Sequence, residues 1–356
     1  MAYLKLYKKK LEHNHAFLSK LFKEEGVEWG VVTKLFCGTE KYLQEIVNLG
    51  VVEVHDSRIS NLRKLKELKP DIQTVYIKPA AKRSIKDIIS YADVSLNTEL
   101  DTIKMLSEEA GRQDKLHKII IMIEMGDLRE GVMADYVVEF YAQIFKLPNI
   151  RVIGLGTNLN CLHGVLPSED KLIQLSLYKK IIELTFGREI PWVSAGTTVT
   201  LPLLIRGLLP KGVNHFRIGE ALYWGNDIFS NGYIEGMETD VLEFFAEIVE
   251  ITKKPLIPTG VLAENPSGEM FQINEEDYGK MSYRCIIDVG LLDIRPEFLI
   301  PKDETIEMVG ASSDMLVIDL KTNPNNYKIG DVVAFTLKYM GALSLMNSNY
   351  VEKIVE

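Results

Sequence analysis

The chain has 356 residues, of which 46% are hydrophobic and 26% are charged, and its formal net charge at pH 7 is −9. The length exceeds one ordinary compact core and favours two domains, while the acidic balance disfavours binding to nucleic-acid phosphates. No apolar run approaches the ~20 residues of a membrane span, and the N-terminus lacks the apolar segment of a secretory signal, so we expect a cytoplasmic protein with no nucleic-acid or membrane partner.

Residues 26–220 alternate short β-branched runs with longer amphipathic segments, which is the pattern of repeated βα units around a parallel sheet. The amphipathic segments include residues 59–68, in which leucine or isoleucine recurs every three residues, and residues 172–184. No Gly-rich phosphate turn, typical of an open doubly wound sheet, follows the first run. We therefore predict an α/β fold with a (β/α)8 TIM-type barrel. The eight predicted strands are residues 29–34, 51–56, 74–77, 94–97, 119–124, 152–158, 192–195 and 216–219.

The sequence changes in character after about residue 236. Segments such as YRCIIDVGLLDI and DVVAFTLKYM are β-rich and are separated by Pro, Gly and Asn turns. No internal repeat or low-complexity linker is evident. We assign residues 12–235 to the barrel and residues 236–356 to a C-terminal β domain, to which residues 1–11 add an N-terminal strand.

The first predicted strand ends in Lys34, directly after an apolar run. The active site of such a barrel lies at the carboxyl ends of its strands. An amine that is partly removed from water there is favoured in its neutral form, which attacks carbonyl groups. Lys34 is therefore a candidate Schiff-base lysine. The alternative is that its side chain extends from the strand end into solvent without a chemical role.

Two later segments have the composition of a phosphate site. SAGTT, residues 194–198, lies at the end of the seventh predicted strand, and RIGE, residues 217–220, lies at the end of the eighth. Their hydroxyl groups, and backbone that can approach an anion closely at glycine, suit a phosphate. The loops after the seventh and eighth strands are the recurrent phosphate position in these barrels. The alternative is that they are ordinary turn residues.

Seven segments, in chain order, resemble the alanine racemase group of fold-type III pyridoxal-phosphate enzymes, and within it the ornithine racemase branch. They are VVTKLFCG, DSRISNL, IIMIEMGDLREG, GLGTNLNC, SAGTT, RIGEALYWG and VGASSDMLVIDL. The resemblance extends over nearly the whole chain, and GDLREG and GASSD are particularly specific to that branch. It implies a pyridoxal 5'-phosphate cofactor, a homodimer, and racemisation of a free amino acid such as ornithine or another basic one.

Carried onto this sequence, the resemblance implies that Lys34 is the Schiff-base lysine and that Arg217 faces the pyridine nitrogen of the cofactor. A guanidinium stays protonated, so it donates to the ring nitrogen rather than protonating it. The ring is then a weaker electron sink, which favours prompt reprotonation over elimination or transamination. Arg129 matches an arginine near the substrate carboxylate. The other implied cofactor-binding residues are Asn158, Ser194, Thr197, Thr198, Gly219 and Glu220.

One segment departs from the family. Alanine racemases carry a catalytic tyrosine in a Gly-Tyr-Ala-Asp segment, which reads Gly-Leu-Leu-Asp at residues 290–293. Racemisation needs a proton donor on each face of the reacting carbon, so another group must substitute or Lys34 must serve both faces. Cys161 is one candidate, because a thiol beside a cationic site ionises more readily, although it could also be a buried small hydrophobe. Ser313 and Asp314 are the other candidates, and they could instead bind the substrate carboxylate.

Three other readings stay open at this point. The protein could be a pyridoxal-phosphate carrier without turnover, or an alanine racemase with an altered second base. A D-amino-acid aldolase or dehydratase of this fold would add a metal site near the C-terminus, but no histidine follows His215 and the three cysteines are widely spaced, so we predict no metal. Acidic residues that could receive a distal ammonium include Asp127, Asp288 and Asp293.

Overall fold

The structure is a computed structural model that describes residues 2–265, 268 and 270–356. The chain divides into two compact units, one comprising Tyr7–Val241 and the other joining residues 2–6 to Leu242–Glu356. The first unit is a closed barrel of eight parallel strands, and the second is built on a mainly antiparallel sheet. The predicted fold class is therefore confirmed. Among the described residues, none of the helices combines the length and the apolar character needed to cross a bilayer.

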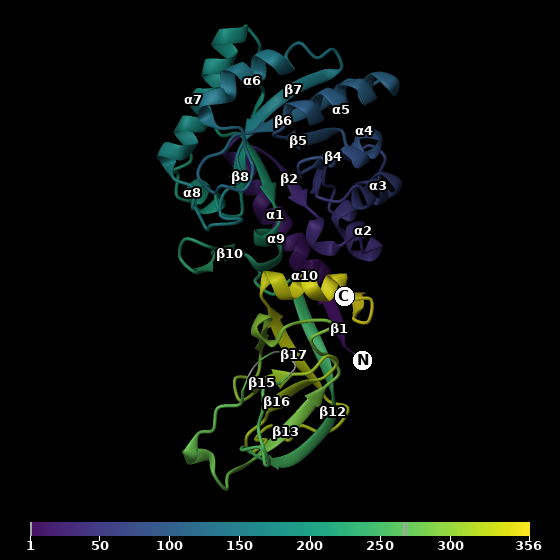
Figure 1. Ribbon diagram of the computed structural model, residues 1–356, viewed down its shortest axis with the longest axis vertical. Helices are drawn as coiled ribbons and strands as arrows, with labels where there is room; N and C mark the ends of the chain where they lie inside the picture. Colours follow the sequence, from purple (N-terminus) through teal and green to yellow (C-terminus); the bar gives the residue numbers. More distant parts are fainter. Residues whose placement is uncertain (1, 266–267, 269) are drawn as a thin grey trace. The chain divides into compact units, whose positions relative to one another are not determined.

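In the barrel, each strand pairs in parallel with its neighbours in the sequence, and the last strand closes on the first. The strands are β2 (Glu28–Val32), β3 (Glu53–Asp56), β4 (Gln73–Tyr76), β5 (Val94–Asn97), β6 (His117–Met122), β7 (Ile150–Gly156), β8 (Trp192–Thr197) and β9 (His215–Ile218). One helix follows each strand, as Figure 1 shows. These helices are α2 (Glu40–Asn48), α3 (Ile59–Leu68), α4 (Ile85–Tyr91), α5 (Leu100–Arg112), α6 (Val137–Ile144), α7 (Glu169–Phe186), α8 (Leu201–Ile205) and α9 (Glu220–Trp224).

All eight predicted strands are present, and each observed end lies within two residues of the predicted one. Helix α3 has the predicted bounds because apolar side chains at three-residue spacing bury one of its faces. Barrel strands are buried on both sides, so they read as β-branched runs, and this makes them easy to locate in the sequence.

The barrel interior is apolar on one side and polar on the other. Branched and aromatic side chains fill the part lined by β4–β8, and they are Val75, Val94, Leu96, Ile120, Met122, Ile153 and Trp192. The part lined by β3 and β9 instead holds buried polar side chains, among them Glu53, His55 and His215. A buried polar group is costly unless it is hydrogen-bonded, so the partners of these three side chains need to be identified.

The N-terminal segment differs from the prediction. Strand β1 covers only Tyr3–Leu6, and helix α1 begins directly afterwards and covers Lys8–Glu24. The assignment of residues 1–11 to one strand is therefore wrong in its second half. Leu11, Leu18 and Phe22 are buried, and their spacing places them on one face of a helix.

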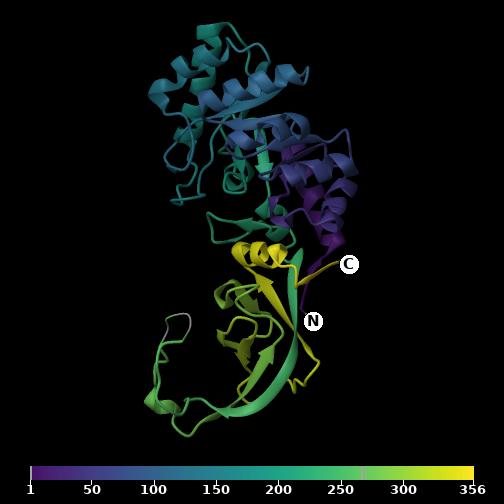
Figure 2. The same cartoon turned by 45° about the vertical axis from the view of Figure 1, so that its right-hand side comes forward.

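The second unit has one sheet in the strand order β14-β17-β12-β13-β16-β15, and β1 pairs with both β12 and β18. Its strands are β12 (Leu242–Pro255), β13 (Met281–Ile287), β14 (Leu299–Pro301), β15 (Glu307–Ala311), β16 (Leu316–Asp319), β17 (Val332–Leu337) and β18 (Glu352–Val355), and its helix is α10 (Tyr339–Asn347). Figure 2 shows the long, curved β12, which holds together strands from both ends of the chain.

Candidate active site

Lys34 lies at the carboxyl end of the first barrel strand, as predicted. Strand β2 stops two residues earlier, and Lys34 begins a short 3-10 segment, Lys34–Phe36. Its side chain is exposed, so the desolvation expected from the sequence is not observed. Its charge reaches the carboxyl of Glu220 at the start of α9: burial raises the pKa of Glu220, while a hydrogen bond from Asn226 and the charge of Lys34 oppose that rise. The first and last strands thus bring Lys34 and Glu220 close together.

Arg217 on β9 is buried, with 4% of its surface exposed. Nη1 donates to the carbonyl and the hydroxyl of Ser194, at 2.6 and 2.5 Å, and Nη2 donates to the carbonyl of Thr157 at 2.8 Å and to Oδ1 of Asn158 at 3.3 Å. Four acceptors therefore occupy the two terminal nitrogens. Because a guanidinium has five N–H donors, Nε–H is the one left without a partner among the hydrogen bonds of the described residues. Burial lowers the pKa of Arg217 to about 10, and the electrostatic influence of neighbouring Cys161 and Glu130 opposes that fall, so the guanidinium stays charged at neutral pH.

Ser194 lies behind Arg217 and is fully buried. Its hydroxyl is 2.7 Å from Nδ1 of His215, and Nε2 of His215 is 2.8 Å from Oε1 of Glu53. Ser194 thus contacts both Arg217 and His215. The sequence analysis missed Glu53 and His215. For His215 a signal was available in the sequence: it stands two residues before Arg217 on one strand, so the two side chains face the same side.

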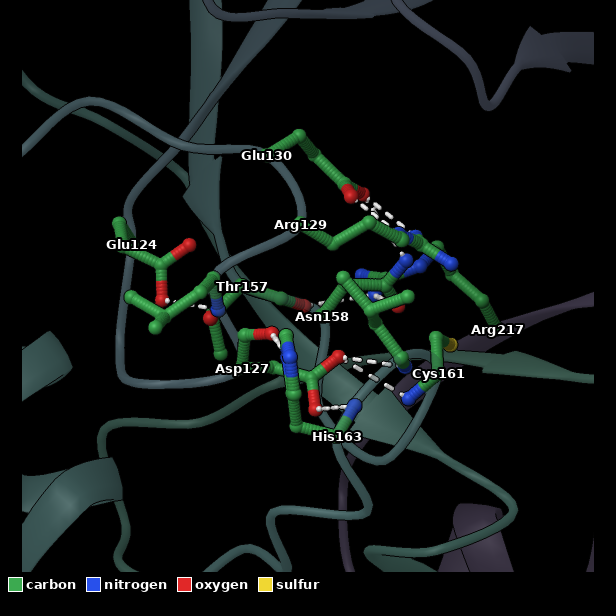
Figure 3. A network of polar contacts seen from close by, with 11 residues as sticks. Glu124, Asp127, Arg129, Glu130, Thr157, Asn158, Cys161, His163 and Arg217 are labelled. Atoms are coloured by element: carbon green, nitrogen blue, oxygen red, sulfur yellow. Dashed lines mark hydrogen bonds and ion pairs between the residues drawn. The ribbon is translucent and has the colours of Figure 1, made fainter.

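Two charged residues from the GDLREG segment lie beside Arg217, as Figure 3 shows. Glu130 accepts a hydrogen bond from Nδ2 of Asn158 at 3.1 Å and pairs with the guanidinium of Arg129 through both of its oxygens. Hydrogen bonds to Glu130 are the main reason why the pKa of Arg129 lies above its ordinary value, and neighbouring Cys161 adds to the rise. Arg129 therefore already has an anionic partner, which the sequence did not predict.

Asp127 holds the loop that carries Cys161. The carboxylate is buried, with 1% exposed, and accepts four backbone N–H groups: Oδ2 from Cys161 and Leu162, at 3.1 and 2.9 Å, and Oδ1 from His163 and Val165, at 3.1 and 3.3 Å. Burial acts to raise the pKa of Asp127, but the backbone N–H groups outweigh it and hold that pKa below its ordinary value. Asp127 is therefore not available to receive a distal substrate ammonium, which corrects one of the predicted alternatives.

The predicted phosphate residues meet where β8 and β9 end. Thr197 is the last residue of β8, and the hydroxyl of Thr198 accepts the backbone N–H of Ala221 at 3.1 Å. Gly219 lies between β9 and α9, and a Cβ there would come within 3.2 Å of Val32 on β2, so glycine allows the backbone to run close to the first strand. These residues form a hydroxyl-rich edge on the same side of the barrel as Lys34.

Ser313 and Asp314 belong to the second unit, where both are exposed. The hydroxyl of Ser313 donates to Asp314 at 3.2 Å, and its carbonyl accepts the N–H of Leu292 at 2.7 Å. Gly290 packs so closely that a Cβ would lie 2.4 Å from the backbone of Asp314. The Gly-Leu-Leu-Asp segment, residues 290–293, therefore packs directly on GASSD. The hydroxyl of Ser348 donates a hydrogen bond to Asp293.

Comparisons with known proteins agree with this architecture. Residues 7–227 match the family described as "Alanine racemase, N-terminal domain". The ornithine racemase of Acetoanaerobium sticklandii is 35% identical over 345 residues, covering 97% of this chain and 96% of that protein; the lysine racemase of Thermotoga maritima is 31% identical over 348 residues, covering 98% and 96%. A solved alanine racemase from Bartonella henselae with covalently bound pyridoxal phosphate shares the fold, with a TM-score of 0.75 at 14% identity over 100% of this chain and 99% of that one. The chain therefore belongs to the alanine racemase family.

Proposed function

We propose that this protein is a pyridoxal-phosphate-dependent racemase that interconverts the L and D forms of a free basic amino acid such as ornithine or lysine. The observation that carries the proposal is the buried guanidinium of Arg217, which has four acceptors on its terminal nitrogens and one N–H left to donate. The names of the two relatives, an ornithine racemase and a lysine racemase that each match almost the whole chain, support the basic substrate.

The donor set fits pyridoxal phosphate. Lys34 offers a primary amine for the aldehyde, Thr197 and Thr198 offer hydroxyls for the phosphate, and Nε–H of Arg217 suits an acceptor such as the pyridine nitrogen. When bound, the cofactor withdraws electrons from the substrate Cα and so acidifies the α-proton. The protein binds and orients the cofactor and the substrate, and it supplies the groups that move the proton.

Arg217 favours racemisation over side reactions. A guanidinium donates a hydrogen bond to the ring nitrogen and does not give up its proton. Arg217 would therefore leave the ring nitrogen of a bound cofactor unprotonated, which would favour prompt return of the proton to the same carbon. Asn158 stands beside this guanidinium and links it to Glu130.

Two proton carriers are needed, one on each face of the α-carbon. In this proposal Nζ of Lys34 takes or returns the proton on one face, and Sγ of Cys161 serves the other. The support for Cys161 is its location: it is exposed, and its sulfur lies close enough to interact electrostatically with both Arg129 and Arg217. Its loop is fixed by Asp127, so the thiol has a defined position.

The test of the function compares Lys34→Ala with Lys82→Ala. Each lysine is exposed and begins a 3-10 segment after a barrel strand, so the second variant is a matched control. The wild type and Lys82→Ala should bind pyridoxal phosphate with visible absorbance and racemise L-ornithine or L-lysine, followed by circular dichroism. Lys34→Ala should lose both properties and keep its fold. A protein that binds the cofactor but racemises no amino acid would be a carrier.

The test of Cys161 is the variant Cys161→Ser in solvent deuterium. A serine hydroxyl is a far weaker acid than a thiol, so deuterium should enter one enantiomer much faster than the other while cofactor absorbance is unchanged. Cys37→Ser is the control, because Cys37 lies within three residues of Lys34 but on a different strand end from Cys161. Equal exchange into both enantiomers at the wild-type rate would remove Cys161 from the mechanism.

We also propose a homodimer. A barrel mouth without a cover leaves the reacting carbon open to water, and a two-fold dimer offers a partner surface to close it. Light scattering at assay concentrations, combined with activity measured over the same dilution range, tests this. An active monomer would contradict it.

A further inference from the structure

A cluster of three ionisable side chains lies inside the barrel and has no part in the chemistry described so far. Nε2 of His55 is 2.7 Å and Nε2 of His215 is 2.8 Å from the same oxygen of Glu53, Oε1, and Gln73 donates to the other oxygen, Oε2, at 2.5 Å. All three ionisable side chains are buried, with at most 6% exposed. Such a cluster costs free energy unless its protons and lone pairs are matched.

The protons of this cluster can be assigned from its contacts. A carboxylate only accepts hydrogen bonds, so Nε2 of each histidine carries a proton. A neutral imidazole has one N–H, so Nδ1 of a neutral His215 holds a lone pair that accepts the hydroxyl of Ser194, 2.7 Å away. The lone pairs of Ser194 in turn receive Nη1–H of Arg217 at 2.5 Å. The hydrogen bonds therefore point in one direction, from the guanidinium through Ser194 and His215 to Glu53.

His55 forms a side branch. Its Nδ1 is buried and has no hydrogen-bond partner in the described part of the chain, which suits a lone pair better than a buried N–H. Burial also lowers the pKa of His55, against the charge of Glu53. His55 is thus a neutral donor to Glu53 and lies outside the path to Arg217.

The surrounding residues make room for the cluster. A Cβ on Gly30 would lie 2.5 Å from Nε2 of His55 and 2.7 Å from Oε1 of Glu53, so only glycine fits at this point of β2. On the other side, the ring of Trp192 stacks on His215 with centroids 4.2 Å apart and planes at 16°. The imidazole of His215 is therefore held by stacking as well as by its two hydrogen bonds.

We propose that Glu53, His215 and Ser194 are positioning residues, which form a buried relay that fixes the Arg217 guanidinium and so determines the fate of the substrate carbon above it. Glu53 is the buried anion at the inner end of the relay, and Arg217 is the cation at its outer end. The relay fixes Nη1 of Arg217. The guanidinium is thereby held so that its Nε–H can donate to an acceptor above it. The inference rests on the proposed function only in assigning that acceptor to the cofactor.

A metal ion is the competing explanation of the same three residues, because their ligand atoms lie within 4.8 Å of one another. Two ligand atoms that each lie ~2.0–2.2 Å from a tetrahedral zinc are roughly 3.3–3.6 Å from each other. The N···O separations of 2.7 and 2.8 Å are shorter than that and are those of hydrogen bonds. Elemental analysis of the full-length protein distinguishes the two. One zinc per chain that is lost in Glu53→Gln would overturn the relay.

The first experiment reads the imidazole protons by 15N NMR of the full-length protein, before and after addition of pyridoxal phosphate. His215 should be protonated at Nε2 and unprotonated at Nδ1. Glu53→Gln keeps an acceptor and should preserve this tautomer, whereas Glu53→Leu removes the acceptor and should lose it. His55→Gln is the control: it disturbs the same cluster but can still donate to Glu53, so His215 should be unchanged. A wild-type His215 protonated at Nδ1 would overturn the proposal.

The second experiment measures the fate of the substrate carbon. Glu53→Leu and Ser194→Ala should raise the transaminated by-product, relative to racemised product, by about tenfold, the effect of one hydrogen bond to a charged group, and should shift the visible band of the bound cofactor. His55→Gln should do neither. Ser194→Ala removes one oxygen and covers the case in which Glu53→Leu does not fold. An equal ratio of transaminated to racemised product in Ser194→Ala and His55→Gln would refute the relay. Absence of cofactor binding in the wild type would refute the proposed function instead, and the tautomer of His215 would still decide the relay.

Discussion

Replacing Asp127 by asparagine is expected to release the loop that carries Cys161 while the barrel stays folded. The carboxylate accepts four backbone N–H groups, two on each oxygen. Asparagine keeps one oxygen and presents an NH2 group to the other pair, so two of the four bonds are lost. A hydrogen bond to a charged acceptor contributes about 1.5–3 kcal/mol, and the loop can relax in part, which gives a loss of about 2–4 kcal/mol.

This loss should appear locally, because loops open with a smaller free energy than the whole fold. Hydrogen exchange at the N–H of Cys161, Leu162, His163 and Val165 should accelerate by roughly 30- to 1,000-fold, since 1.4 kcal/mol corresponds to a factor of ten. Asp135→Asn is the matched control, because Asp135 is exposed and lies in the same connection. Exchange within twofold of the wild type at these four amides would refute the anchoring role of Asp127.

The pH dependence of the loop has a defined sign. The pKa of Asp127 is lowered in the folded protein by the backbone N–H groups. Its contribution is therefore fully present above the ordinary aspartate value of about 3.9, and it is lost as the pH falls through the lower folded value. Protection of the loop in the wild type should persist down to about pH 4, whereas in Asp127→Asn it should be weak at every pH.

Three further outcomes are expected. Arg217→Glu should slow racemisation and raise the transaminated by-product, because a carboxyl allows the ring nitrogen of the cofactor to be protonated. If chromatography shows the wild-type ratio of the two products, Arg217 is not the hydrogen-bond donor to the ring nitrogen. Gly30→Ala should lower the free energy of unfolding in urea by about 1–3 kcal/mol, because its Cβ would lie 2.5 Å from His55, whereas Gly310→Ala has open space and should change little. Thr198→Val should weaken cofactor binding about tenfold through one lost hydrogen bond, measured by fluorescence titration, and an unchanged affinity would exclude Thr198 from the phosphate site.

Much of the fold could be read from local sequence patterns. A buried parallel strand needs a run of apolar, often β-branched residues, and the following helix needs apolar residues on one face. Both patterns are local, which is why every barrel strand was found within two residues. The N-terminal helix was missed because Lys8, Lys9 and Lys10 conceal the start of the apolar stripe formed by Leu11, Leu18 and Phe22.

The positions of Lys34, Arg217 and the SAGTT loop followed from the strand count, because strand ends meet at one edge of a barrel. Their partners did not follow. Glu130 is the residue next to Arg129, and nothing local shows that its carboxylate holds that guanidinium rather than facing solvent. Asp127 was a candidate ligand for substrate until the fold placed four backbone N–H groups around it.

The relay beneath Arg217 was decided by tertiary structure alone. Glu53 and His215 are 162 residues apart in the chain, and they meet because the barrel closes β9 onto β2, with β3 on the other side. Glycine at position 30 of the intervening strand leaves the space in which they bond. The sequence by itself determined where the strands lie and which side chains of a strand share a face, since the latter depends on a period of two residues. Which of those side chains touch depends on closure and register, and these are properties of the whole barrel.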